Sequence, residues 1–203
     1  MKTATAATAA RATEENWAFP PAEGWTFDQV KRLELPFDWE LVDGCIVVRG
    51  RTMLWHNHVR NQLAQALGDA RGKPFDVVTG QCAMVDAHHV RVPDVIVYDS
   101  TGLNVFETEC VPISAVALAI EVVSPGSRSQ DRVLKPAQYA AAKVPSYWRV
   151  ELQRDNQLAV HEYWLNADTR SYIPRPERPV HRRELTTDLP FPLKIDLADL
   201  LGF

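Results

Sequence analysis

The sequence predicts an α/β protein built on a mixed β-sheet with helices against it, and three observations support this class. Residues 116–123 form a run in which seven of eight residues are apolar, which is typical of a strand covered on both faces. Asp43-Gly44 lies between two β-rich runs and indicates an antiparallel hairpin. A helical segment over 130–143 separates two further strands, as in a crossover between parallel strands.

Length and composition indicate one globular domain. The chain has 203 residues, of which 46% are hydrophobic and 24% charged, enough for a sizeable core but short for two well-formed domains. We expect a disordered tail over residues 1–22, because residues 1–15 are small and polar, and a single domain over 23–203. No run of eighteen apolar residues occurs, so no transmembrane helix is expected.

The cysteines indicate the cellular compartment that we expect, and the net charge bears on whether the protein binds nucleic acid. The chain has an odd number of cysteines, Cys45, Cys82 and Cys110, and none of them has C-x-x-C spacing. We therefore expect three reduced thiols in a cytoplasmic protein. A formal net charge of −4 provides no general electrostatic argument for binding nucleic acid.

Two helices are expected in the first third of the chain. Thr26 and Gln29 fit a capping box, which predicts a short helix to Leu33. Residues 55–70 read as an amphipathic helix with a periodic apolar stripe. His56 lies at the start of that helix, where surface or capping histidines are commoner than site residues.

The remaining elements follow from apolar runs and turn signals. Pro136 is tolerated only near a helix start, so the helix within 130–143 should begin between Asp131 and Lys135. The strands expected from these patterns are 39–42, 45–48, 75–85, 90–98, 115–124, 146–152, 158–165 and 193–195, and a short helix should follow at 197–201.

Glu121 lies inside the most apolar of these strands. A buried, unpartnered carboxylate costs several kcal/mol, so a partner is required. The candidates are a divalent metal, a buried Lys or Arg, or a raised pKa that leaves the acid neutral.

Asp94 follows Pro93 at a point where a strand should be interrupted. Two carboxylates on adjacent strands, Asp94 and Glu121, can share one Mg²⁺ ion, and the carbonyl of Val122 could add another oxygen ligand. Lys135, on the following helix, could polarise or deprotonate an attacking water or balance charge on phosphorus.

Structural interpretations of these residues remain open. Asp94 could be a strand-end residue that accepts a backbone hydrogen bond, and Glu121 with Lys135 could be a structural ion pair. Glu40 on the first hairpin could face solvent, and Arg128 and Arg132 could either touch phosphates or face water.

One segment carries a family resemblance. W-E-L-V-D-G, then V-P-D-V-I-V, then E-V-x-S-P, a D-x-x-x-K-x-x-x-Y helix and V-P-x-Y-W occur in that order, and Glu121 to Val150 is the specific part. This pattern resembles the Uma family of restriction endonucleases in the PD-(D/E)XK nuclease superfamily. Val123 stands where the strand form of that motif has lysine, so the resemblance requires the lysine on the helix.

The resemblance implies a restriction-endonuclease-like fold and a Mg²⁺-dependent endonuclease, with Mn²⁺ as a second ion that could serve. It implies Asp94 and Glu121 as metal ligands, Lys135 as the catalytic lysine and a supporting role for Glu40. DNA is then the expected substrate, with Arg128 and Arg132 flanking the site, and a homodimer is expected by analogy with the fold. The alternative is a catalytically inactive nuclease-fold module that binds DNA or protein.

Overall fold

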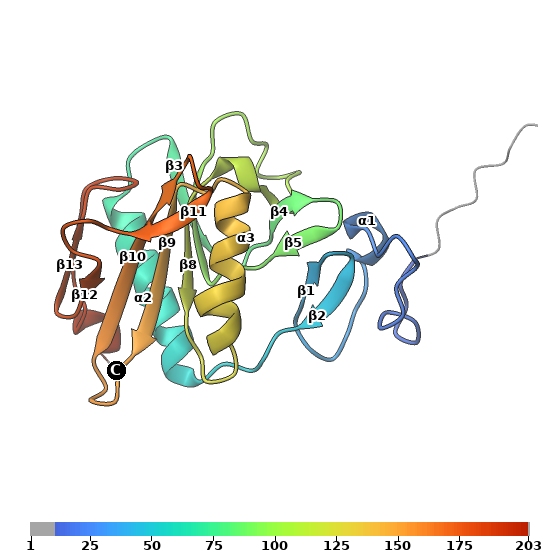
Figure 1. The fold of residues 1–203 in the computed structure, drawn as a ribbon, viewed down its shortest axis with the longest axis horizontal. Coiled ribbons are helices and arrows are strands. Elements are labelled where there is room, and N and C mark those ends of the chain that lie inside the picture. The colour runs from blue at the N-terminus through green and yellow to red at the C-terminus, as the bar shows by residue number, and fades with distance from the viewer. Residues whose placement is uncertain (1–10, 203) are drawn as a thin grey trace, which may run out of the picture. The chain divides into compact units, whose positions relative to one another are not determined.

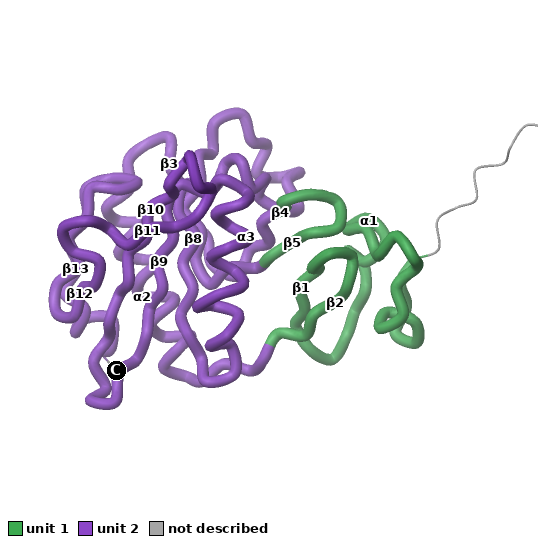
Figure 2. The backbone as a smooth tube through the Cα atoms, viewed as in Figure 1, with its two compact units in different colours: residues 1–49, 84–91 green, residues 50–83, 92–203 purple. Residues whose placement is uncertain are grey.

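The computed structural model describes residues 11–202 (Figure 1). The chain forms two compact units (Figure 2), one made of residues 1–49 and 84–91 and the other of residues 50–83 and 92–203. The predicted division into a disordered tail and one domain over 23–203 stays a prediction. Residues 1–10 of that tail lie outside the described residues, whereas Ala12 donates its backbone N–H to Gln29 at 3.2 Å.

The first unit is built around the predicted hairpin. Strands β1 (Trp39–Val42) and β2 (Cys45–Val48) pair antiparallel, and β1 also pairs with β5 (His89–Arg91). Gly44 has φ +71°, and a Cβ on it would lie 2.6 Å from the Cα of Gly24, so the turn requires glycine. Helix α1 (Phe27–Val30) confirms the prediction from the capping box, because the N–H of Thr26 donates to Gln29 Oε1 at 2.8 Å.

The second unit holds a sheet in the order β11-β10-β9-β8-β6-β3, with β12 beside β10. Its strands are β3 (Phe75–Thr79), β6 (Val95–Asp99), β8 (Val116–Val122), β9 (Ser146–Leu152), β10 (Leu158–Asn166), β11 (Ser171–Pro174) and β12 (Val180–His181). Only the β8–β9 pair among these is parallel in the described part of the chain. The sheet is therefore mixed, as predicted.

Strand β8 is buried because it has neighbours and covering elements on all sides. It pairs with β6 on one edge and β9 on the other, and a helical crossover joins it to β9. One face packs against helix α2 (Leu54–Ala70) through Val59, Leu63 and Leu67. The other face carries Ala119, which clusters with Tyr139 of the crossover helix.

The crossover helix begins earlier than the proline argument predicted. A π-helical turn at Gln130–Leu134 runs directly into α3 (Lys135–Ala141), with Pro136 in the first turn of the α-helical part. Pro136 has no N–H to donate to the preceding turn, so regular α-helical hydrogen bonding is interrupted there, and the π-helical turn lies directly before it. Figure 1 shows α3 alongside β8 and β9.

The C-terminal region contains strands that the sequence patterns missed. Besides β11 and β12, these include β13 (Glu184–Thr187), which forms a hairpin with the predicted last strand, β14 (Leu193–Asp196). Leu185, Leu193 and Ile195 of this hairpin extend the core. The helix expected at 197–201 is a 3₁₀ turn at Asp199–Leu201. Prolines between 174 and 190 shorten these strands, so their alternation is hard to recognise.

Two other expectations need correction. The run 75–85 divides into β3 and β4 (Ala83–Asp86), and 90–98 divides into β5 and β6, because Pro93 interrupts pairing. The short strand β7 (Val111–Pro112) and the 3₁₀ turn Ile113–Ala115 precede β8.

The expectation of three reduced thiols is also wrong. Cys82 and Cys110 form a disulfide with their Cα atoms 4.8 Å apart, and Cys45 is free and exposed. The backbone brings the two together, since the N–H of Val111 donates to the carbonyl of Cys82 at 2.8 Å. Within residues 11–202, no helix has the length and apolar character needed to cross a membrane.

Candidate functional site

The second unit brings Asp94, Glu121 and Lys135 together, as the sequence predicted they would be. Val95 pairs with Ile120, so Asp94, directly before β6, lies opposite Glu121 on β8. Lys135 reaches the same place from the start of α3, and its Nζ donates to Glu121 Oε2 at 2.8 Å. All three side chains are buried, with exposed fractions of 4%, 1% and 6%.

The partner that Glu121 requires is therefore present in the protein itself. Its second oxygen, Oε1, accepts a hydrogen bond from the hydroxyl of Tyr139 at 2.8 Å. Of the partners that the sequence left open, the described residues supply a buried ammonium group and, in addition, a phenolic hydroxyl. This geometry also fits the structural ion-pair interpretation.

One face of the crossover helix carries Asp131, Lys135 and Tyr139 at intervals of four residues. Asp131 Oδ1 lies 3.1 Å from Lys135 Nζ, so the ammonium is held between two carboxylates. The other oxygen of Asp131 accepts a hydrogen bond from Ser127, and its main-chain carbonyl accepts one from Tyr147 at 2.6 Å. These contacts hold the lysine in one position.

Asp94 is held by a backbone amide and by a histidine. Its Oδ2 accepts the N–H of Val122 at 2.8 Å and lies 3.2 Å from His56 Nε2. Burial by itself raises the pKa of the Asp94 carboxyl, but the hydrogen bond and charge of His56, with the amide of Val122, bring the pKa below its ordinary value. The carboxylate is therefore ionised at neutral pH, as a metal ligand must be.

His56 contacts the site, although its sequence position favoured a surface or capping histidine. It is buried at 2% exposure, and its Nδ1 has no hydrogen-bond partner among the described residues. The signal was helical spacing, because His56 precedes Val59, Leu63 and Leu67 on the buried stripe of α2. A histidine at that register faces the sheet.

The donor set suits a hard cation that keeps much of its water shell. The two carboxylates on neighbouring strands are the oxygen ligands that Mg²⁺ prefers. The orphaned His56 Nδ1 shows that the polar interior is not fully satisfied by the described residues. Among residues 11–202, no group of three or more His, Cys, Asp or Glu residues is arranged so that it could hold a metal ion. Water would have to supply the other ligands.

Sequence comparison places this site within a family. A family model described as "Uma2: Putative restriction endonuclease" matches residues 26–198. The chain belongs to the Uma2 family. No curated protein matches it.

A solved structure shares the fold of this Uma2 protein. It is the crystal structure of a "putative nuclease belonging to DUF820" from Anabaena variabilis ATCC 29413. The two chains are 16% identical, the match covers 87% of this chain and 97% of that one, and the TM-score is 0.60. At this identity the likeness establishes that the two proteins share a mixed α/β fold.

Glu40 lies in the first unit of the Uma2 chain and has its own partners there. Its Oε2 accepts a hydrogen bond from Arg91 Nη1 at 2.7 Å, and Arg49 Nε lies 4.0 Å from Oε1. Glu40 and Arg91 are both buried. Its predicted supporting role in catalysis stays a prediction.

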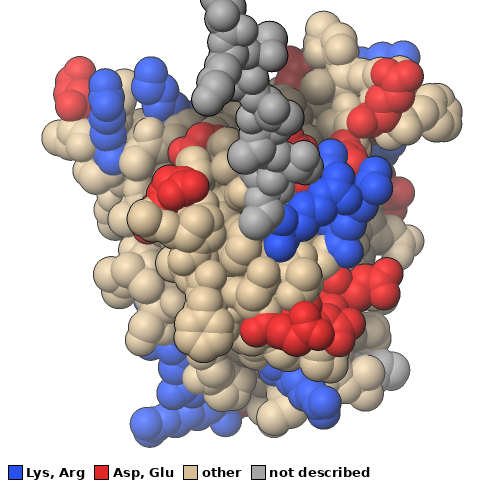
Figure 3. Space-filling model, turned by 90° about the vertical axis from the view of Figure 1, so that its right-hand side faces the viewer, with Lys and Arg blue, Asp and Glu red and all other residues tan. Residues whose placement is uncertain are grey.

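The two arginines predicted to contact nucleic acid differ in their surroundings. Arg128 is exposed at the start of the crossover helix. Arg132 forms two hydrogen bonds to Glu151, at 3.1 and 2.6 Å, and is therefore oriented by the sheet. On the face drawn in Figure 3, acidic and basic side chains both occur among uncharged surface, so this face is not uniformly negative.

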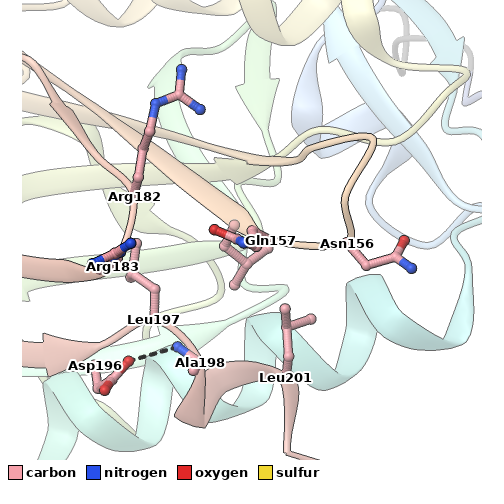
Figure 4. A pocket seen from close by; sticks show the side chains of 9 residues that line it. Asn156, Gln157, Arg182, Arg183, Asp196, Leu197, Ala198 and Leu201 are labelled. Carbon is pink, nitrogen blue, oxygen red and sulfur yellow. Dashed lines mark hydrogen bonds between the residues drawn. The ribbon is translucent and has the colours of Figure 1, made fainter.

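A separate pocket of about 410 Å³ lies at the C-terminal end of the second unit (Figure 4). Arg182, Arg183 and Asp196 contribute its charged groups, and the Asp196 carboxylate accepts the N–H of Ala198 at 2.9 Å. None of the predicted site residues lines this pocket. It is therefore distinct from the Asp94–Glu121–Lys135 cluster.

Proposed function

We propose that this Uma2 protein is a metal-dependent endonuclease that hydrolyses DNA phosphodiester bonds, with Asp94, Glu121 and Lys135 as its catalytic residues. The observation that carries the proposal is the convergence of two buried carboxylates and a buried ammonium on neighbouring elements of the sheet. Groups of this kind are costly to bury, and they are the groups that phosphodiester hydrolysis requires. The family description and the fold of the nuclease neighbour support the same reaction class.

Asp94 and Glu121, with the carbonyl of Val122, are the groups that would hold Mg²⁺ or Mn²⁺. The bound ion would supply Lewis-acid activation of the phosphate and of a water molecule. The lowered pKa of Asp94 supports its part, because the carboxylate needs no proton removed before it binds a cation.

Lys135 would act on the reacting groups directly. Hydrolysis forms a bond from a water oxygen to phosphorus and breaks the bond from phosphorus to the leaving oxygen of the sugar, while the water releases a proton to solvent and the leaving oxygen takes one up. An ammonium beside the phosphate balances the negative charge that develops on the phosphate oxygens. Asp131 and Glu121 orient this ammonium before substrate arrives.

The alternative function is a non-catalytic module that binds DNA or protein on the same scaffold. The observation that favours it is the saturation of Glu121, because both carboxylate oxygens already accept hydrogen bonds, from Lys135 and Tyr139. In such a module the cluster would be a structural ion pair. A homodimer and a cytoplasmic location remain predictions for either function.

Cleavage of supercoiled plasmid DNA distinguishes the endonuclease from the non-catalytic module. We expect nicking or cutting by the wild type with Mg²⁺ or Mn²⁺ and none with EDTA, and a loss of about a hundredfold or more in Asp94→Asn and Lys135→Met. Asp99→Asn is the matched control, because Asp99 ends the same strand and lies outside the cluster. Titration calorimetry should show Mg²⁺ binding to the wild type and to Asp99→Asn but not to Asp94→Asn.

DNA binding without metal-dependent cleavage, together with no Mg²⁺ binding, would support the non-catalytic module instead. Equal activity in Asp94→Asn and Asp99→Asn would exclude the assigned site.

A further inference from the structure

One row of side chains crosses the sheet from the catalytic cluster. Glu121 on β8 lies in register with Arg149 on β9, and Arg149 lies in register with His161 on β10. Side chains in register on neighbouring strands point to the same face, and neighbouring strands are about 4.8 Å apart. Arg149 is therefore one strand away from Glu121, on the face that α3 covers.

Beside this row lies a pocket of about 300 Å³ that no predicted site residue other than Arg132 lines. Its walls come from the crossover helix, from β9 and β10, and from the start of β11. Arg132, Arg149 and Arg170 supply its charge, and Tyr163, Tyr172 and Ser171 complete the polar and aromatic lining.

Two of the arginines are held by one carboxylate. Glu151 accepts two hydrogen bonds from Arg132, and Arg149 Nε lies 2.7 Å from its Oε1. Arg149 also lies over the ring of Tyr163, 5.5 Å from its centroid. A guanidinium has five N–H donors, so each arginine keeps donors beyond those used on Glu151.

The charge of this cluster is positive. Three arginines face one glutamate, and Arg170 has no ion-pair partner among the described residues. The pKa values of His161 and Glu151, which neighbour these arginines, are shifted by the same positive charge. Burial lowers the pKa of His161, and the positive charge of Arg149 lowers it further against the opposing charge of Glu151. Burial raises the pKa of Glu151, but Arg132 and Arg149 bring it below its ordinary value.

We propose that the pocket of Arg132, Arg149 and Arg170 binds a backbone phosphate of the DNA strand that flanks the scissile phosphate. This inference rests on the proposed function, because it extends the path of the substrate from Glu121 across β9. Planar guanidinium groups in fixed orientation suit the tetrahedral oxygens of phosphate. Arg132 connects the two sites, since it precedes Lys135 by one helical turn.

Arg170→Asn tests the pocket without disturbing the catalytic cluster. Arg170 has φ +50°, a conformation that asparagine tolerates better than most other non-glycine residues. Arg154→Asn is the matched control, because Arg154 is also exposed, on the β9–β10 turn, but does not line the pocket. Both variants remove one positive charge.

The assay is fluorescence anisotropy of a labelled DNA duplex with EDTA present, over a range of salt concentrations, so that binding is measured without cleavage. Arg170→Asn should raise the Kd about tenfold and reduce the slope of log K against log salt by about 0.9, the value for one lost phosphate contact. Arg154→Asn should change neither.

Equal effects of Arg170→Asn and Arg154→Asn, or an unchanged salt slope in Arg170→Asn, would overturn the pocket assignment. Cleavage is scored separately with Mg²⁺. A wild type that binds DNA through Arg170 but does not cut it would refute the proposed hydrolysis and leave the phosphate pocket in place.

Discussion

Replacing Lys135 with methionine should destabilise the protein strongly, because it removes the ammonium that two buried carboxylates share. Lys135 is 6% exposed and Glu121 is 1% exposed, and their charged atoms are 2.8 Å apart. Asp131 lies 3.1 Å from the same ammonium. Methionine keeps the length and apolar stem of the side chain, so the change removes mainly the charge.

The expected loss is about 4 kcal/mol in the free energy of unfolding, within the range of about 3–5 kcal/mol for breaking a buried ion pair. With a urea dependence of about 2.5 kcal/mol/M, the unfolding midpoint should fall by about 1.6 M. Adding Glu121→Gln to Lys135→Met should recover about half of this loss, because an amide can still accept from Tyr139 and carries no charge.

Urea unfolding followed by tryptophan fluorescence measures both variants. Lys194→Met is the matched control, since Lys194 pairs with Glu184 at 2.9 Å but its side chain is 71% exposed, and its midpoint should not change. If Lys135→Met had the same urea midpoint as Lys194→Met, Lys135 would not be the partner that buried Glu121 requires.

Two further predictions concern the second unit. Glu162 is buried and accepts hydrogen bonds from Thr187 at 2.7 Å and Arg175 at 2.9 Å, with His181 at 3.0 Å. Burial raises its pKa, but these partners bring it below the ordinary 4.5, so its stabilising effect is present above that value and is lost as pH falls through the lower folded-state pKa. The urea midpoint of Glu162→Gln should therefore lie below that of the wild type at neutral pH, and the difference should shrink as the pH falls below 4.5, whereas a difference that does not vary with pH would contradict this. The Cys82–Cys110 disulfide closes a loop of 28 residues, so Cys82→Ser with Cys110→Ser should lose about 3 kcal/mol, and Cys45→Ser should lose none. Thiol titration of the unfolded wild type without reductant should detect one free thiol, and a count of three would refute the disulfide.

Much of the fold around β8 could be predicted because its signals are local. An apolar run, an Asp-Gly turn and a stripe at helical spacing each depend on a few neighbouring residues, and the structure confirms β8, the β1–β2 hairpin and α2. Strands β11, β12 and β13 were missed because they are two to four residues long and lie among prolines, where alternation is too short to detect.

In the candidate site, too, some residues could be recognised from local sequence and others could not. Glu121 stood out because a carboxylate within an apolar strand requires a partner, and Lys135 stood out through its place on the following helix. His56 could not be recognised in this way, because its place in the site depends on its contact with Asp94. Asp94 is 38 positions further along the chain, and the two side chains meet only when α2 packs on the sheet.

The sequence by itself determined the central strand, the crossover helix and the identity of the charged residues that must be partnered, because burial and periodicity act through local pattern. Only the tertiary structure decided which partners meet. It placed Lys135 and Tyr139 on Glu121, His56 on Asp94, Cys82 against Cys110, and the arginines of three separate elements around one pocket. These contacts depend on strand register and helix packing, which bring together residues that are distant in the chain.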